Sequence, residues 1–144
     1  ALGEACLYAL PARDAELPAQ NIAEQRVLWG IDTPDPGAPT RLIAEGDALA
    51  VGEATLQVME VPGHTPGGVV LFAATKEGNI AFVGDTLFPG SHGRTDLAGG
   101  NEVAICRSLR KMARELPSDT VCLIGHGPMT TIEAELSDNP FMHQ

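Results

Sequence analysis

Residues 61–68 read Val-Pro-Gly-His-Thr-Pro-Gly-Gly, an apolar run that ends in a turn carrying a histidine. A short apolar run, a glycine and a metal-capable side chain follow one another three times, at Val58 to His64, Ile80 to Asp85 and Val121 to His126. A glycine beside such a side chain lets the backbone turn sharply and approach a bound group closely, as a site at the rim of a sheet requires. Taken singly, each is typical of an ordinary turn. Taken together, they favour a shared metal site, because imidazole and carboxylate are ligands of zinc, iron and manganese.

The segments around these turns predict a β-rich region between residues 48 and 85, where Gly and Pro turns separate apolar runs of strand length. Residues 68–73 and 80–84 are expected to form a hairpin across the turn at Lys76 to Asn79. Residues 86–100 show no hydrophobic period and are expected to form a long loop.

The clearest helix is predicted over residues 102–116, where Ile105, Leu109, Met112 and Leu116 recur at helical spacing and Pro117 follows. Residues 121–124 are expected to form a buried strand. Thr130 and Glu133 have the spacing of a capping box for a last helix that ends at Asn139-Pro140.

The first third of the chain has weaker signals. Residues 4–10 are compatible with a buried strand, and residues 19–29 predict a helix with Ile22 and Trp29 on one face and Gly30 as its stop. Residues 33–39 contain three prolines and predict a loop.

The length of 144 residues favours one domain, residues 1–144. A formal charge of −10 disfavours nucleic acid or an anionic membrane as a partner, and no apolar run is long enough to span a bilayer, so we expect a cytoplasmic protein. Three widely spaced cysteines, Cys6, Cys106 and Cys122, suit structural thiols better than a disulfide framework.

Three segments carry a family resemblance: residues 61–68, Val83-Gly84-Asp85-Thr86-Leu87-Phe88 and Gly125-His126-Gly127-Pro128. They resemble signature segments of the metallo-β-lactamase superfamily, in particular its glyoxalase II-like branch of small hydrolases. The resemblance implies an α/β fold, part of an αββα sandwich and mainly its second half. It also implies two zinc ions, with iron or manganese as alternatives, that activate a hydroxide against a thioester, ester or lactone.

Residue by residue, the resemblance assigns His64 to the first metal, His126 to the second and Asp85 as the catalytic carboxylate that bridges both. Arg94 occupies the place of a basic residue that binds the carboxylate end of a glutathione thioester, the expected small-molecule substrate. Thr65 or Thr86 would orient ligands.

The family's His-x-His-x-Asp-His run is absent, and neither His92 nor His143 has the spacing to replace it. We therefore expect an N-terminally incomplete domain that begins just past that run, and a chain that is nearly inactive alone. Two other hypotheses stay open: a mono-iron enzyme that oxidises persulfides, and a catalytically incomplete fragment that needs a partner or forms a homo-oligomer.

Overall fold

The computed structural model describes residues 8–32 and 34–143, and its internal contacts divide between two units, Ala1–Ile43 and Ala44–Gln144. The prediction of a single domain stays a prediction. In the first unit, two short strands pair in parallel and a 3₁₀ turn and a helix lie between them in sequence: β1 (Ala9–Pro11), η1 (Ala12–Asp14), α1 (Leu17–Trp29) and β2 (Arg41–Ile43).

Helix α1 ends as its sequence predicts. Gly30 takes a left-handed conformation (φ 65°) and donates its backbone N–H to the carbonyl of Arg26, as a glycine C-cap does. The face predicted from Ile22 and Trp29 is not buried, however: no residue of this helix is buried, and Trp29 is 69% exposed. The strand predicted over residues 4–10 lies largely outside the described residues, and its described end overlaps β1.

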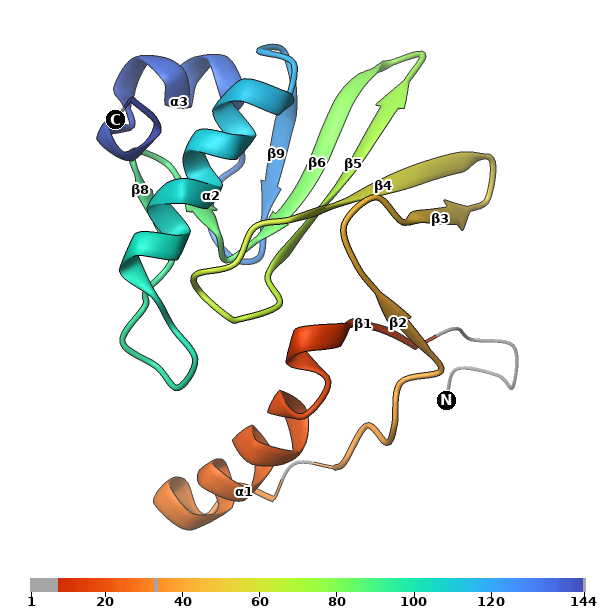
Figure 1. Ribbon diagram of the computed structural model, residues 1–144, viewed down its shortest axis with the longest axis vertical. Helices are drawn as coiled ribbons and strands as arrows, with labels where there is room; N and C mark the ends of the chain where they lie inside the picture. The colour runs from red at the N-terminus through yellow and green to blue at the C-terminus, as the bar shows by residue number, and fades with distance from the viewer. Residues whose placement is uncertain (1–7, 33, 144) are drawn as a thin grey trace. The chain divides into compact units, whose positions relative to one another are not determined.

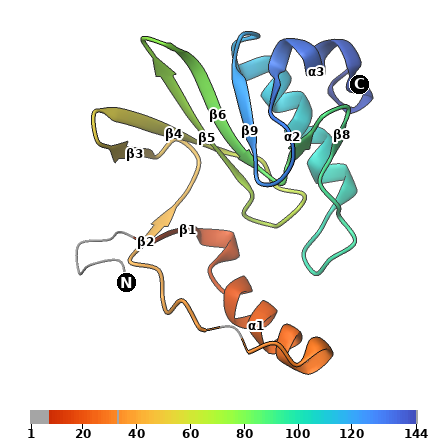
Figure 2. The ribbon, with the colours of Figure 1, turned by 180° about the vertical axis from the view of Figure 1, so that it is seen from behind.

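The second unit is built on a six-stranded sheet with the order β10-β9-β6-β5-β4-β3, which can be followed in Figure 2 from β3 to β9. Its strands are β3 (Ala48–Val51), β4 (Ala54–Glu60), β5 (Val69–Thr75), β6 (Gly78–Gly84), β9 (Val121–Ile124) and β10 (Thr130–Thr131). All neighbours are antiparallel except β6 and β9, which run in parallel. The predicted β-rich region, the hairpin of β5 and β6, and the strand at 121–124 are confirmed.

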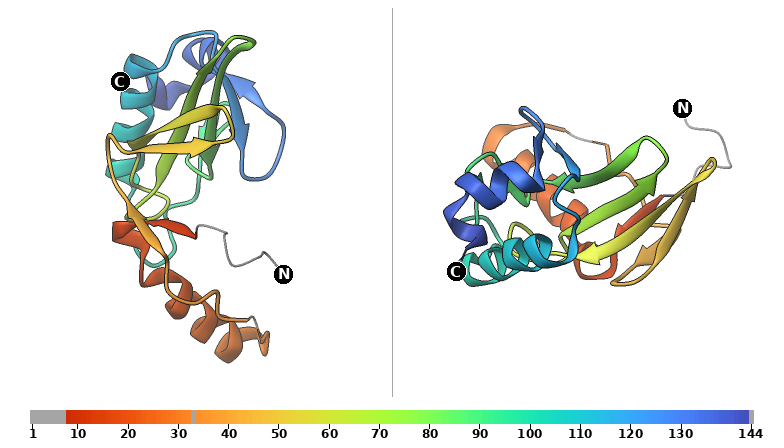
Figure 3. Two further views of the ribbon diagram at one scale, coloured as in Figure 1. Left: turned by 90° about the vertical axis from the view of Figure 1, so that its right-hand side faces the viewer. Right: turned by 90° about the horizontal axis from the view of Figure 1, so that it is seen from above.

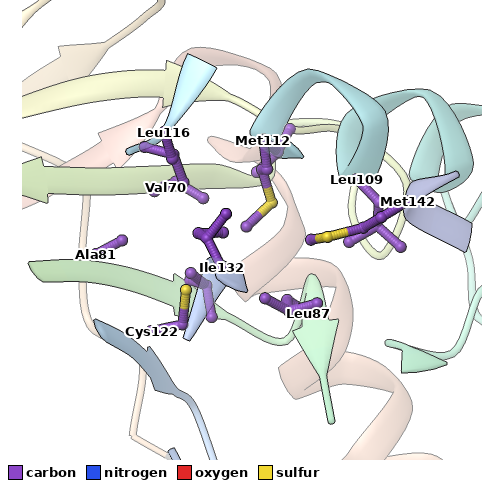
Figure 4. Packing of buried hydrophobic residues seen from close by; sticks show 11 residues of the cluster. Val70, Ala81, Leu87, Leu109, Met112, Leu116, Cys122, Ile132 and Met142 are labelled. Carbon is purple, nitrogen blue, oxygen red and sulfur yellow. The ribbon is translucent and has the colours of Figure 1, made fainter. Parts of the chain in front are cut away.

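Helices α2 (Glu102–Glu115) and α3 (Ile132–Asp138) lie on one face of this sheet (Figures 1 and 3). The predicted period of α2 is confirmed, since the four residues that define it, Ile105, Leu109, Met112 and the C-cap Leu116, are at most 5% exposed. Leu109, Met112 and Leu116 join a core with residues of β5, β6, β9, α3 and the 3₁₀ turn η2 (Pro140–Met142). Figure 4 shows part of this core: Val70, Ala81, Leu87, Leu109, Met112, Leu116, Cys122, Ile132 and Met142. Burial of these side chains against the helices is the main stabilising term for the unit.

The loop expected at residues 86–100 contains a small hairpin, with β7 (Leu87–Phe88) antiparallel to β8 (Ser91–His92). Two-residue strands have no hydrophobic period to detect. Tertiary contacts hold the hairpin in place, since Leu87 is fully buried in the core and the Asn139 amide donates to the Ser91 carbonyl at 2.9 Å.

The capping prediction for the last helix is wrong by one residue. Thr131 is the N-cap and accepts the N–H of Ala134, whereas the Thr130 hydroxyl donates to the Glu135 carboxylate at 2.6 Å. Glu135 is almost completely buried and also accepts from the Gly90 N–H and the Asn139 amide, each at 2.9 Å. This carboxylate therefore ties the β7–β8 turn to α3. The C-cap at Asn139 agrees with the prediction.

None of the helices in residues 8–32 and 34–143 combines the length and the apolar character that crossing a membrane requires.

Candidate functional site

The carboxyl ends of three strands meet at one edge of the sheet. Strand β6 runs directly into Asp85, β9 reaches His126 after one glycine, and β4 is followed by the turn that carries His64. Because β6 and β9 are parallel, and because β4 runs in the same direction as β6 across the antiparallel β5, their ends fall on the same side. A hydrogen bond from the Gly125 N–H to the Gly84 carbonyl, 2.9 Å long, joins two of these ends.

The three predicted ligands are neighbours in the folded chain. His126 Nδ1 lies 3.1 Å from Asp85 Oδ1, and His64 Nε2 lies 3.8 Å from Asp85 Oδ2. Each oxygen of this one carboxylate therefore faces a different imidazole. The structure brings the residues together as the sequence predicts, and their role as metal ligands stays a prediction.

His64 is held in a defined orientation by the loop that follows Asp85. Its Nδ1 lies 2.8 Å from the backbone carbonyl of Arg94. A carbonyl can only accept, so this ring nitrogen is the donor, and Nε2 is directed toward Asp85. A backbone carbonyl that fixes the imidazole tautomer in this way is the usual outer partner of a metal-ligating histidine.

His126 is positioned by one aromatic contact and is otherwise open to solvent. The ring of Phe88 meets its imidazole edge to face, with the ring centres 5.0 Å apart, and the His126 side chain is 75% exposed. The sequence does not predict the Phe88 contact, because residues 86–100 show no hydrophobic period from which a side-chain direction follows.

Two glycines are required by the close packing around Asp85. A Cβ at Gly93 would lie 1.7 Å from the Asp85 carbonyl oxygen, and a Cβ at Gly125 would lie 2.3 Å from Asp85 Oδ1. Neither is in a left-handed conformation, so the requirement is steric. The predicted role of glycine beside the ligands, close backbone approach, agrees with this geometry.

A pocket of about 310 Å³ opens over the site. It is lined by the three predicted ligands and by residues of the β7–β8 hairpin and the turn after it: His64, Asp85, Phe88, Ser91, His92, Gly93, Arg94 and His126. The expectation that residues 86–100 form part of a substrate wall agrees with this lining, which includes His92. Arg94 is the only lysine or arginine among these lining residues.

Arg94 reaches the pocket, and its guanidinium forms a bidentate pair with Asp96, with both N–O distances 2.7 Å. This hydrogen bonding lowers the pKa of Asp96 to about 2 and raises the pKa of Arg94. Substrate binding by Arg94 stays a prediction, and so does the orienting role of Thr65 or Thr86. The sequence did not indicate that the backbone carbonyl of Arg94 contacts His64.

The family can be tested directly by comparison with known proteins. A family model of the metallo-beta-lactamase superfamily matches residues 7–126, most of the chain. The chain belongs to this superfamily. The crystal structure of TTHA1623 in a di-iron-bound form is 36% identical with a TM-score of 0.78, covering 92% of this chain and 63% of that one. The expected fold class, part of a metallo-β-lactamase sandwich, is therefore confirmed.

Curated relatives within the superfamily are matched over part of their length. Probable metallo-hydrolase YqgX of Bacillus subtilis is 39% identical over 106 residues, 73% of this chain and 49% of that protein. Hydroxyacylglutathione hydrolase GloC of Haemophilus influenzae is 34% identical over 125 residues, 86% of this chain and 58% of that protein. The chain spans about half the length of the curated relatives it matches.

The residues of the site fit the metals that the superfamily implies. Two imidazoles and a carboxylate form a donor set that zinc, iron and manganese accept, and the hydrogen bond at His64 Nδ1 leaves Nε2 on the side of Asp85.

Proposed function

We propose that this chain supplies His64, Asp85 and His126 to a two-metal hydrolytic centre, with Asp85 bridging the ions. The observation that carries the proposal is the placement of one imidazole beside each oxygen of the Asp85 carboxylate. The persulfide-oxidising alternative would use one iron and would share His64 and Asp85, so metal analysis of the purified protein discriminates the two. The placement of His126 beside the second oxygen of Asp85 supports the two-metal proposal.

Bound divalent ions at such a centre supply an activated water and polarise a carbonyl group. The chain's own residues supply orientation. The Arg94 carbonyl holds the His64 ring, the edge of Phe88 supports His126, and Gly125 leaves room for the Asp85 carboxylate beside it. Fixed ligands of this kind lose little conformational entropy when a metal binds.

The substrate we propose is a thioester, ester or lactone, with a hydroxyacylglutathione as the leading candidate. The similarity to GloC supports this choice, and so does the pocket, whose single guanidinium at Arg94 suits an anionic substrate. Binding a substrate carboxylate requires Arg94 to exchange Asp96 for the substrate. Both groups of this pair are more than half exposed, and an exposed pair contributes little stability, so the exchange costs little.

Because these residues offer few ligands to each ion, we expect them to bind metal weakly on their own. Each ion would receive one terminal histidine and a share of Asp85, whereas a zinc hydrolase site usually has three protein ligands. We therefore expect residues 1–144 to be nearly inactive. A leading segment of the same superfamily that carries the His-x-His-x-Asp-His run should supply the remaining ligands.

The experiment compares residues 1–144 with the same residues joined to such a segment. Metal content after dialysis and hydrolysis of a hydroxyacylglutathione are measured for both, with and without a chelator. We expect metal and chelator-sensitive hydrolysis in the joined protein, and loss of both in its Asp85→Asn variant. Equal metal content in Asp85→Asn and the parent would refute the bridging role.

A matched pair of variants tests the substrate assignment. Arg94→Ala in the joined protein should raise KM for the anionic thioester about tenfold and leave KM for a neutral lactone unchanged. Arg107→Ala, which removes an exposed arginine from α2, is the control and should change neither. A similar rise in KM for both substrates would contradict recognition of a carboxylate by Arg94.

A further inference from the structure

A second cluster of metal-ligating side chains joins the β7–β8 hairpin to the first turns of α2. His92 is the last residue of β8, and Glu102 and Cys106 lie four residues apart on one face of the helix. One donor atom from each of the three lies within 4.8 Å of the other two. Residues 8–32 and 34–143 contain no second group of three that meets this distance.

The orientation of His92 directs one ring nitrogen at the carboxylate of the cluster. Its Nδ1 lies 2.9 Å from the carbonyl oxygen of Gly93, and its Nε2 lies 3.1 Å from Glu102 Oε1. A neutral imidazole has one N–H, so two oxygen acceptors require a positive charge on one side, supplied either by a second proton or by a metal ion on Nε2. The nearby Cys106 thiol, a third metal-ligating group, favours the metal ion over the proton.

The carboxylate of Glu102 is also held from outside the cluster. The Thr95 hydroxyl donates to Oε2 at 2.6 Å, which leaves Oε1 directed at His92. Hydrogen bonds of this kind to the far side of a carboxylate or imidazole ligand are typical around metal sites.

We propose that His92 Nε2, the Glu102 carboxylate and the Cys106 thiolate bind a zinc ion, with a fourth position open to water. Imidazole, carboxylate and thiolate together select a borderline divalent cation and disfavour calcium or magnesium, which prefer all-oxygen sites. Binding displaces the Cys106 thiol proton to solvent, so the ion gains a thiolate ligand. This site is separate from the His64, Asp85 and His126 centre, which contains no sulfur.

The zinc would act as a clamp for the neighbouring centre. It would join both ends of the segment from His92 to Glu102, and this segment carries the Gly93 backbone that packs on Asp85 and the Arg94 carbonyl that orients His64. Closing the segment with a metal reduces its conformational freedom and holds these contacts in place.

Cobalt(II) titration of residues 1–144 tests the site, because a thiolate bound to cobalt gives an intense charge-transfer absorption that imidazole and carboxylate do not. We expect this band in the parent protein, its loss in Cys106→Ser, and at least a tenfold weaker zinc affinity in His92→Ala. Cys6→Ser is the thiol control and should keep the band. His64→Ala and Asp85→Asn should also keep it, which separates this site from the proposed hydrolytic centre.

Circular dichroism of each variant confirms that a lost band does not reflect an unfolded chain. Absence of the band in the folded parent would refute the proposal and leave His92 and Glu102 as a protonated ion pair. A band that survives in Cys106→Ser, or disappears in Cys6→Ser, would place the thiolate elsewhere and refute it equally.

Discussion

Replacing Gly125 with alanine tests whether the position of the Asp85 carboxylate controls metal binding. The new Cβ would lie 2.3 Å from Asp85 Oδ1, and contacts below 3.0 Å are essentially never seen, so the two atoms must separate by about 0.7 Å. Asp85 is the group that can move, because its side chain is 31% exposed. A shift of this size exceeds the roughly 0.5 Å tolerance of a binding constellation.

The expected costs for folding and for binding differ. Turning one partly exposed carboxylate off its rotamer costs about 1 kcal/mol in the free energy of unfolding. Metal affinity should fall about 10- to 100-fold, because Oδ1 leaves the position beside His126 Nδ1. Metal affinity is measured by calorimetric titration of the protein joined to the leading segment, and stability by urea denaturation of the same protein.

Gly90→Ala is the matched control for this variant. Gly90 has a left-handed conformation (φ 68°) with nothing within 4 Å of an added Cβ, so alanine there costs about 1 to 2 kcal/mol without contacting Asp85. It should leave metal affinity unchanged. Unchanged affinity in Gly125→Ala as well, at the same loss of stability, would refute the reasoning that the carboxylate position governs binding.

Three further predictions follow from contacts within the second unit. In Gly93→Ala the added Cβ would lie 1.7 Å from the Asp85 carbonyl oxygen, so the free energy of unfolding should fall by about 3 kcal/mol in urea denaturation. A loss below about 1 kcal/mol would contradict this close packing. Glu135→Ala removes the carboxylate that accepts from the Thr130 hydroxyl, the Gly90 N–H and the Asn139 amide, and should cost about 3 kcal/mol in the same assay, whereas exposed Glu133→Ala should cost little. Burial, with a smaller contribution from Glu135, raises the pKa of the Cys122 thiol from 9.0 to about 12. Because this thiol ionises at lower pH in the unfolded chain than in the folded one, the free energy of unfolding falls above about pH 9, by up to about 1.4 kcal/mol per pH unit. Cys122→Ala should show a shallower alkaline loss, and equal slopes in the two proteins would rule out this linkage.

The sequence was sufficient for the features that depend on local pattern. The period of Ile105, Leu109 and Met112 predicted the buried face of α2, because apolar residues at this spacing lie on one face of a helix. The three apolar runs that end in glycine and a ligand residue predicted which side chains would meet, since the ends of strands with the same direction share one edge of a sheet.

Features that depend on tertiary contacts were missed or misplaced. Thr130 and Thr131 are equally good N-caps in the sequence, and the choice between them is made by Glu135, which engages the hydroxyl of Thr130. The approach of His92 to α2 could not be read from spacing either. The separation of Glu102 and Cys106 is visible in the sequence, but the hairpin that brings His92 to them is held by tertiary contacts, the burial of Leu87 and the hydrogen bonds of Glu135 and Asn139.

The order of the strands explains why Asp85 lies between the two histidines. Strand β6 has β9 on one side and β5, followed by β4, on the other. The histidine that follows β9 and the histidine that follows β4 must therefore reach Asp85 from opposite directions, and this is why each meets a different oxygen of its carboxylate. A carboxylate at the end of an edge strand would have a neighbour on one side only. The position of Asp85 between the two histidines is thus a property of the sheet order, and Gly93 and Gly125 leave room for Asp85 in that position.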